Sequence, residues 1–231
     1  MGFSISDYAV SSYTPTLNAL IHAMESSEIC PKFQGLLAIS QPNTPGQSAL
    51  PNTAVELTCI QSLATNIAFH TLEEQAATVK SVLKGMEAHS WVHLACHAVQ
   101  DIIEPTKSAF CLHDGHLELS TIITVTFPHA DFAFLSACQT ATGDEKLSDE
   151  AVHLAAGMML AGYHSIIATT WSIRDSDGPV VAEHVYTNLL KGTEPDSKQA
   201  ALALYYAVKC LRKRVGDMDF LSWVPFIHVG I

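Results

Sequence analysis

Two stretches of sequence decide the fold class: WVHLACHA at residues 91–98 and DFAFLSAC at residues 131–138. Each is a short, continuous apolar run, which is typical of a strand buried on both faces of a parallel sheet. Similar runs occur at 35–40 and 165–171, among segments with helical spacing of apolar residues such as AVHLAAGMMLAG at 151–162. Strands alternating with helices predict an α/β fold with a mostly parallel central sheet and helices on both faces.

The rest of the chain predicts further elements around these strands. Thr71 and Glu74 match the pattern of a capping box, which predicts that a helix over 74–88 begins there. Asp114-Gly115 predicts a turn between two short strands within 108–119. The remaining predicted elements are helices at 14–27, 54–65, 179–190 and 198–215 and a final strand at 223–231.

The composition is that of a globular chain. Of its 231 residues, 48% are hydrophobic and 15% charged, and the mean hydropathy is +0.20. These values exclude a disordered chain, and the length allows one domain to bury its own core. No repeat or break in composition divides the sequence. We therefore expect one domain over 33–231, preceded by a helical lead-in at 1–32 that ends an upstream repeat region.

The net charge and the cysteines indicate which partners the protein can bind and in which cellular compartment it occurs. The net charge of −11 argues against nucleic acid and anionic membranes, which are bound through clustered Lys and Arg. No apolar run reaches the roughly 20 residues of a membrane span, and no signal peptide is recognisable. We expect a cytoplasmic protein with free thiols. Its cysteines are Cys30, Cys59, Cys96, Cys111, Cys138 and Cys210.

Three of the predicted strands end in a group that can do chemistry. His97 follows VHLAC, Cys138 follows AFLSA, and the loop after SIIATTW contains Asp175 and Asp177. If the strands are parallel, these groups meet at one rim of the sheet, where α/β proteins bind ligands. A cysteine becomes a good nucleophile when a nearby imidazole takes its proton. The pattern therefore predicts a Cys138–His97 dyad.

Other interpretations of these residues stay open from the pattern alone. A lone cysteine or histidine at a strand end is more often a buried structural group. A zinc site built from His93, Cys96 and His97 is disfavoured, because Cys96 points away from the other two along one strand. No GxGxxG or GxxxxGK[ST] motif occurs, so a phosphate-binding loop has no support.

Several motifs, taken in order, resemble the CHAT domain, the caspase-like domain that follows tetratricopeptide repeats, and especially its fungal members. The resemblance covers about residues 33–231. The motifs are HLACHA at 93–98, P-x-x-S at 105–108, LSACQTATGDEKLSDEAVHLAAGMMLAG at 135–162, IIATTWSIRDSDG at 166–178 and WVPFIHVG at 223–230.

The resemblance implies a caspase-like three-layer α/β/α sandwich, of the clan that also holds separases, and a cysteine endopeptidase activity. Cys138 would be the nucleophile and His97 the general base and then acid, with the backbone N–H groups of Ala98 and Cys138 as oxyanion hole. Relatives usually carry Gly after the histidine, and a left-handed backbone at Ala98 would cost about 1 kcal/mol.

No metal or organic cofactor is implied by the resemblance. The implied partners are a protein or peptide substrate and upstream tetratricopeptide repeats or another regulator. The alternative function is a catalytically silent caspase-like interaction module coupled to such repeats.

The loop WSIRDSDG at 171–178 also resembles the separase loop W-x-x-x-D, in which an acid receives a basic P1 side chain. Asp177 suits the cap of the following helix better, so we expect Asp175 to be the pocket acid, with Arg174 as a competing partner. A partly buried Asp–Arg pair is worth more than the roughly 0–1 kcal/mol of an exposed pair. The sequence therefore predicts cleavage after Arg or Lys, and not after Asp as in caspases.

Overall fold

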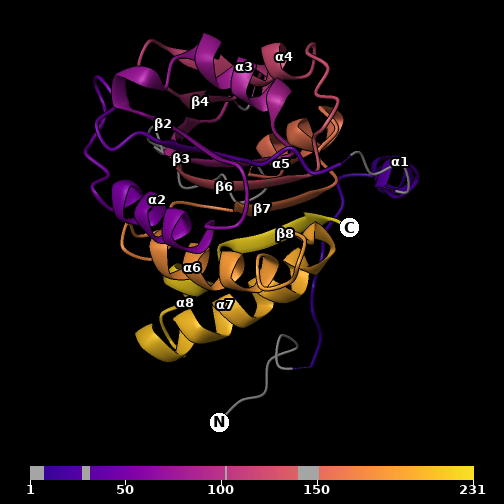
Figure 1. The fold of residues 1–231 in the computed structure, drawn as a ribbon. Helices are drawn as coiled ribbons and strands as arrows, with labels where there is room; N and C mark the ends of the chain where they lie inside the picture. The colour runs from indigo at the N-terminus through magenta and orange to yellow at the C-terminus, as the bar shows by residue number, and fades with distance from the viewer. Residues whose placement is uncertain (1–7, 28–31, 102, 140–150) are drawn as a thin grey trace.

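The computed structural model describes residues 8–27, 32–101, 103–139 and 151–231, with the backbone alone at 26–27, 137–139 and 151–153. An eight-stranded sheet forms the centre of the molecule, and its main path runs β2-β1-β3-β6-β7-β8 (Figure 1). The strands are β1 Leu36–Ser40, β2 Phe69–Glu73, β3 Trp91–Val99, β4 Ala109–Cys111, β5 His116–Glu118, β6 Phe132–Gln139, β7 Ser165–Thr169 and β8 Phe226–Gly230.

The sheet is mostly parallel, as the alternation of strands and helices predicts. The strands β2, β1, β3, β6 and β7 are parallel neighbours. The final strand β8 is antiparallel to β7, and the β4–β5 hairpin pairs antiparallel with the end of β3. The Asp114-Gly115 turn lies between β4 and β5, where the sequence places it.

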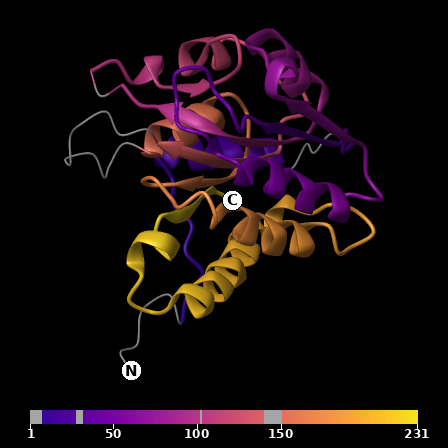
Figure 2. The same cartoon turned by 90° about the vertical axis from the view of Figure 1, so that its left-hand side faces the viewer.

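Helices cover both faces of the sheet and complete the predicted α/β/α sandwich. The helices of the structure are α1 Leu17–Ser27, α2 Asn52–Leu63, α3 Val79–Ala88, α4 Leu119–Ile122, α5 Ala151–Leu160, α6 Gly178–Leu189, α7 Ala200–Val215 and α8 Phe220–Trp223. Of these, α1 lies to the side of the sandwich (Figure 1). The two views agree that α6 and α7, coloured orange to yellow, lie opposite α3 and α4 (Figures 1 and 2).

Successive side chains of each strand point to opposite faces of the sheet, so the core consists of two apolar clusters, one on each face. Leu94 and Leu135 pack with α3 and α5 on one face, whereas Trp91, Phe132 and Phe134 pack with α6 and α7 on the other. The continuous apolar runs therefore reflect burial on both faces.

The prediction that Thr71 and Glu74 begin a helix is wrong. Thr71 lies in β2, where it pairs with Ala38 of β1, so the backbone groups of this segment are satisfied by the sheet. The helix α3 begins instead at Val79, after a capping box in which Thr78 and Ser81 accept each other's backbone N–H. The helix is therefore capped by Thr78, and not by the upstream Thr71.

The segment before α1 extends the sheet past β8. Tyr13 N donates to His228 O and Gly230 N donates to Tyr13 O, each at 2.9 Å. The large side chains Leu17 and Ile21 of α1 are exposed. The boundary near residue 32 and an upstream repeat region stay predictions.

Across the ranges that the structure describes, no helix combines the length and the apolar character needed to cross a membrane.

Candidate active site

The ends of β3, β6 and β7 meet at one rim of the sheet, as their parallel order requires. His97, near the end of β3, is the register partner of Cys138, near the end of β6. The structure describes the backbone of Cys138 but not its side chain. The sheet therefore places the backbones of the two predicted dyad residues directly side by side.

His97 is held in one orientation by a backbone carbonyl. The residue is 2% exposed, and its Nε2 lies 2.8 Å from Ser48 O. A carbonyl oxygen can only accept, so the neutral ring donates its proton from Nε2 and carries its lone pair on Nδ1. Nδ1 is buried and has no hydrogen-bond partner among the described residues. The ring is therefore a base of fixed tautomer.

Ser48 belongs to the loop over 41–51, between β1 and α2. Gln41 N donates to Ala95 O at 2.9 Å, which anchors the start of the loop to β3, and Leu50 N donates to Pro42 O at 2.8 Å, which holds the two ends of the loop together. The sequence does not reveal the role of this loop. The contact uses a main-chain carbonyl, which every residue type provides.

Two other cysteines lie close to His97 in the sheet. Cys96 belongs to the apolar cluster on the opposite face, as strand alternation predicts. Cys111 on β4 is the register partner of His97 on its other side. Burial raises the pKa of the Cys111 thiol to about 11, so this thiol stays protonated and poorly nucleophilic near neutral pH.

The zinc arrangement is not formed. The His93 ring lies against the rings of Phe134 and Tyr186, on the α6 side of the sheet, whereas Cys96 packs on the other side. In the described part of the chain, no cluster of three or more His, Cys, Asp or Glu side chains could hold a metal ion.

Asp175 lies at the same rim and fixes the start of α2. Its Oδ2 accepts hydrogen bonds from the Asn52 backbone N at 3.0 Å and from Asn52 Nδ2 at 2.7 Å. The expected competitor Arg174 pairs with Asp219 instead, with 2.5 Å between Nη1 and Oδ2. Sequence reasoning missed Asn52, because a contact between residues so far apart in the chain leaves no local pattern.

Asp177 occupies the N-cap position of α6, but its side chain makes no capping hydrogen bond. The residue is 4% exposed, and burial raises the pKa of its carboxyl group against the opposing effects of Ser222 and Arg174. Of the two acids in this loop, the half-buried Asp175 is therefore the more accessible one.

Ala98 is buried within β3 and is paired in register with both β4 and β6. Its backbone is not left-handed, since Glu74 is the one non-glycine residue with positive φ among those described. Alanine thus fits this position without the strain that a left-handed backbone would impose. The oxyanion-hole roles of Ala98 and Cys138 stay predictions.

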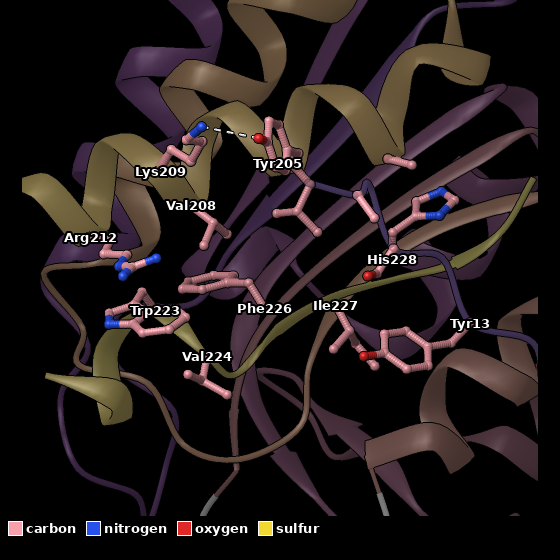
Figure 3. Close-up of a pocket in the computed structure, with 14 residues that line it drawn as sticks. Tyr13, Tyr205, Val208, Lys209, Arg212, Trp223, Val224, Phe226, Ile227 and His228 are labelled. Carbon is pink, nitrogen blue, oxygen red and sulfur yellow. Dashed lines mark hydrogen bonds between the residues drawn. The ribbon is translucent and has the colours of Figure 1, made fainter. Parts of the chain in front are cut away.

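A hollow of about 160 Å³ lies elsewhere, between α7, α8 and β8 (Figure 3). Its walls are mainly apolar and aromatic, with Val208, Trp223 and Phe226 among them, and Tyr205 accepts a hydrogen bond from Lys209 beside it. The strand β7 separates β8 from β6 in the sheet, so this hollow is distinct from the His97 rim.

Comparisons with known proteins place the fold. A protein-family model described as the CHAT domain matches residues 1–231. Among solved structures, the chain is similar to the complex of Porphyromonas gingivalis RgpB pro- and mature domains, with 12% identity, a TM-score of 0.57 and coverage of 86% of this chain and 47% of that chain. It is also similar to the Arg specific cysteine proteinase gingipain R (RGPB), with 14% identity, a TM-score of 0.55 and coverage of 86% and 46%.

The chain therefore spans about half the length of the gingipain chains that it matches. No curated protein matches it significantly. At such low identity, the structural likeness shows a shared fold.

Proposed function

The chain belongs to the CHAT domain family and has a caspase-like fold, and on this premise we propose that it is a cysteine endopeptidase. Cys138 is the nucleophile, and His97 is the general base and then the general acid. The observation that carries the proposal is the pairing of His97 with Cys138 in register, together with the fixed tautomer of the His97 ring. Register partners on neighbouring strands share one face of a sheet, which supports a pair within reach of each other.

The chemistry follows from the orientation of the ring. Nδ1 of His97 takes the thiol proton of Cys138, and the thiolate attacks the scissile carbonyl carbon. The resulting imidazolium donates its proton to the departing amine, which leaves a thioester on Cys138. His97 then takes a proton from a water molecule, the hydroxide attacks the thioester carbonyl carbon, and the proton passes from His97 to the departing Cys138 thiolate as the carboxylic product leaves. Throughout, Ser48 O accepts a hydrogen bond from Nε2 and so stabilises the positive ring as well as the neutral one.

The second part of the proposal concerns specificity: the enzyme cuts after Arg or Lys, and Asp175 receives the basic side chain. Asn52 holds Asp175 through Oδ2, and no hydrogen bond to Oδ1 occurs among the described residues, which leaves that oxygen for a guanidinium or ammonium group. Arg174 is engaged by Asp219 and does not neutralise the pocket acid. Gingipain R, which shares the fold, is described as Arg specific, in line with this assignment.

The activity is tested with a thiol-directed activity probe and a fluorogenic peptide library that varies P1. We expect labelling of Cys138 that disappears in His97→Ala, and cleavage after Arg or Lys. Asp175→Asn keeps an acceptor for Asn52 but removes the charge, so kcat/KM for basic P1 falls about ten- to hundredfold.

Two outcomes would refute parts of this proposal. Cleavage after acidic or small apolar residues, unaltered by Asp175→Asn, would exclude the specificity. The absence of any labelling or hydrolysis that depends on Cys138 would exclude the protease assignment and favour an interaction module. Asp177→Asn is the control, because that buried acid has no part in the proposed pocket.

A further inference from the structure

A buried carboxylate lies directly behind the proposed dyad and has no role in the mechanism above. Glu56 on α2 is 2% exposed, and its Oε1 lies 3.2 Å from His93 Nε2. Its Oε2 accepts a hydrogen bond from Ser136 Oγ at 3.0 Å. The other ring nitrogen of His93 lies 3.2 Å from the Tyr186 hydroxyl. Neither Oε1 nor Nε2 has a hydrogen-bond partner among the described residues, so their close approach is a contact by distance and charge, and the hydrogen bond that holds Glu56 comes from Ser136.

The two strand residues that hold Glu56 precede the two dyad residues. His93 lies before His97 on β3, and Ser136 lies before Cys138 on β6. Glu56 therefore bridges the two central strands just below the rim, on the face that α2 covers.

The same carboxylate sits against the first residue of α6. A Cβ atom added to Gly178 would lie 2.8 Å from Glu56 Oε2 and 3.1 Å from Ser136 Oγ, which is closer than ordinary contact. Glycine therefore lets α6 approach this closely. The amino end of a helix favours a negative charge, which adds to the hydrogen bond from Ser136 in stabilising the buried carboxylate.

Each of the four elements that meet at Glu56 delivers a group of the proposed site. The strands β3 and β6 carry His97 and Cys138, the helix α2 follows the loop of Ser48, and the helix α6 follows the loop of Asp175. Burying a carboxylate without partners costs several kcal/mol, so the partners of Glu56 hold these elements in one arrangement.

We propose that Glu56 is a positioning residue for the reaction, acting through His93 and Ser136 on the placement of the dyad and its loops. The proposal rests on the cysteine-protease function proposed above. Glu56 touches neither substrate nor the reacting atoms. Its contribution is to the geometry of the folded enzyme, and not only to the stability of the fold.

The test compares two buried serines on neighbouring strands. Ser136 donates to Glu56, whereas Ser165 on β7 lies 2.8 Å from His228 Nε2, at the opposite end of the sheet. Ser136→Ala and Ser165→Ala remove one hydroxyl each, and both variants should fold. The readouts are the melting temperature, and kcat and KM on a basic-P1 peptide per active site, titrated with an irreversible thiol inhibitor.

We expect Ser136→Ala to lower kcat several-fold with KM changed less than about twofold, and Glu56→Ala to lower it at least about tenfold. Ser165→Ala should lower stability while leaving kcat unchanged. Glu56→Gln keeps the shape of the side chain and an oxygen that can accept from Ser136, so kcat should return to within about threefold of wild type.

Unchanged kcat per active site in both Ser136→Ala and Glu56→Ala would overturn the proposal, as would an equal loss of kcat in Ser165→Ala. Since Ser136→Ala tests the same contact, the proposal stays falsifiable if Glu56→Ala does not fold. Failure of the protease assignment is recognised separately, because wild type itself would then show no hydrolysis that depends on Cys138.

Discussion

His228 makes the stability of this protein sensitive to mild acid. The residue lies in β8 and is 1% exposed, with Nδ1 at 2.7 Å from Ser12 Oγ and Nε2 at 2.8 Å from Ser165 Oγ. Burial lowers the pKa of its imidazole from 6.5 to about 4. The folded protein therefore takes up this proton much less readily than the unfolded chain.

The sign and size of the effect follow from proton linkage. Between pH 6.5 and 4 the unfolded chain binds more protons at His228 than the folded protein, so stability falls as the pH falls through this window. One pKa unit corresponds to about 1.4 kcal/mol, and a shift of this size weakens folding by about 2–3 kcal/mol between pH 7 and pH 4.5.

The assay is urea unfolding of wild type and His228→Gln at several pH values between 7 and 4.5. Other groups titrate in both proteins, so the difference in unfolding free energy isolates His228. We expect His228→Gln to be less stable at pH 7 and to regain about 2–3 kcal/mol relative to wild type by pH 4.5. A difference that stays constant over this range would refute the assignment of the pKa shift to burial of this ring.

Three further predictions concern the site and the fold. Cys138→Ala and His97→Ala each remove nearly all peptide hydrolysis without unfolding the protein, and the double variant is little worse than either, as steady-state kinetics and circular dichroism would show. Cys111, with its pKa raised to about 11, resists alkylation by iodoacetamide at pH 7.5, so peptide mapping finds no modified Cys111 after Cys138 has reacted completely. Thr78→Ala removes the cap of α3 and lowers the unfolding free energy by about 1 kcal/mol, with activity retained; an equal loss in the non-capping Thr71→Ala would contradict the cap assignment.

The strands that build the rim were predictable because burial on both faces leaves a continuous apolar pattern. This holds for β3, β6 and β7. The edge strand β2 was not predicted, because only Leu72 in its sequence FHTLE is buried and the other side chains are polar or half-exposed. The direction of β8 was equally open, since an apolar run does not specify parallel or antiparallel pairing.

Some residues of the candidate site could likewise be predicted from the sequence, and others could not. That His97 and Cys138 lie side by side could be predicted from the sequence, because each stands at the end of a buried apolar run. Ser48, Asn52 and Glu56 could not, because their roles depend on contacts between distant segments. Ser48 contacts His97 through a backbone carbonyl, and Asn52 at the start of a helix contacts Asp175 in a distant loop. Neither contact leaves a pattern in composition or spacing.

The two faces of the central strands differ in a way that the apolar runs conceal. On the face toward α3 and α5, the residues Leu94 and Cys96 of β3 are apolar and contribute to the core. On the face toward α2 and α6, His93 and His97 stand on the same strand, and both are buried. Buried polar groups cost several kcal/mol each unless partners satisfy them, and the polar groups that lie opposite this row are Glu56, Tyr186 and Ser48 O. A core built for stability alone would place apolar side chains there, which is the physical reason to seek the function of this domain on the α2 face.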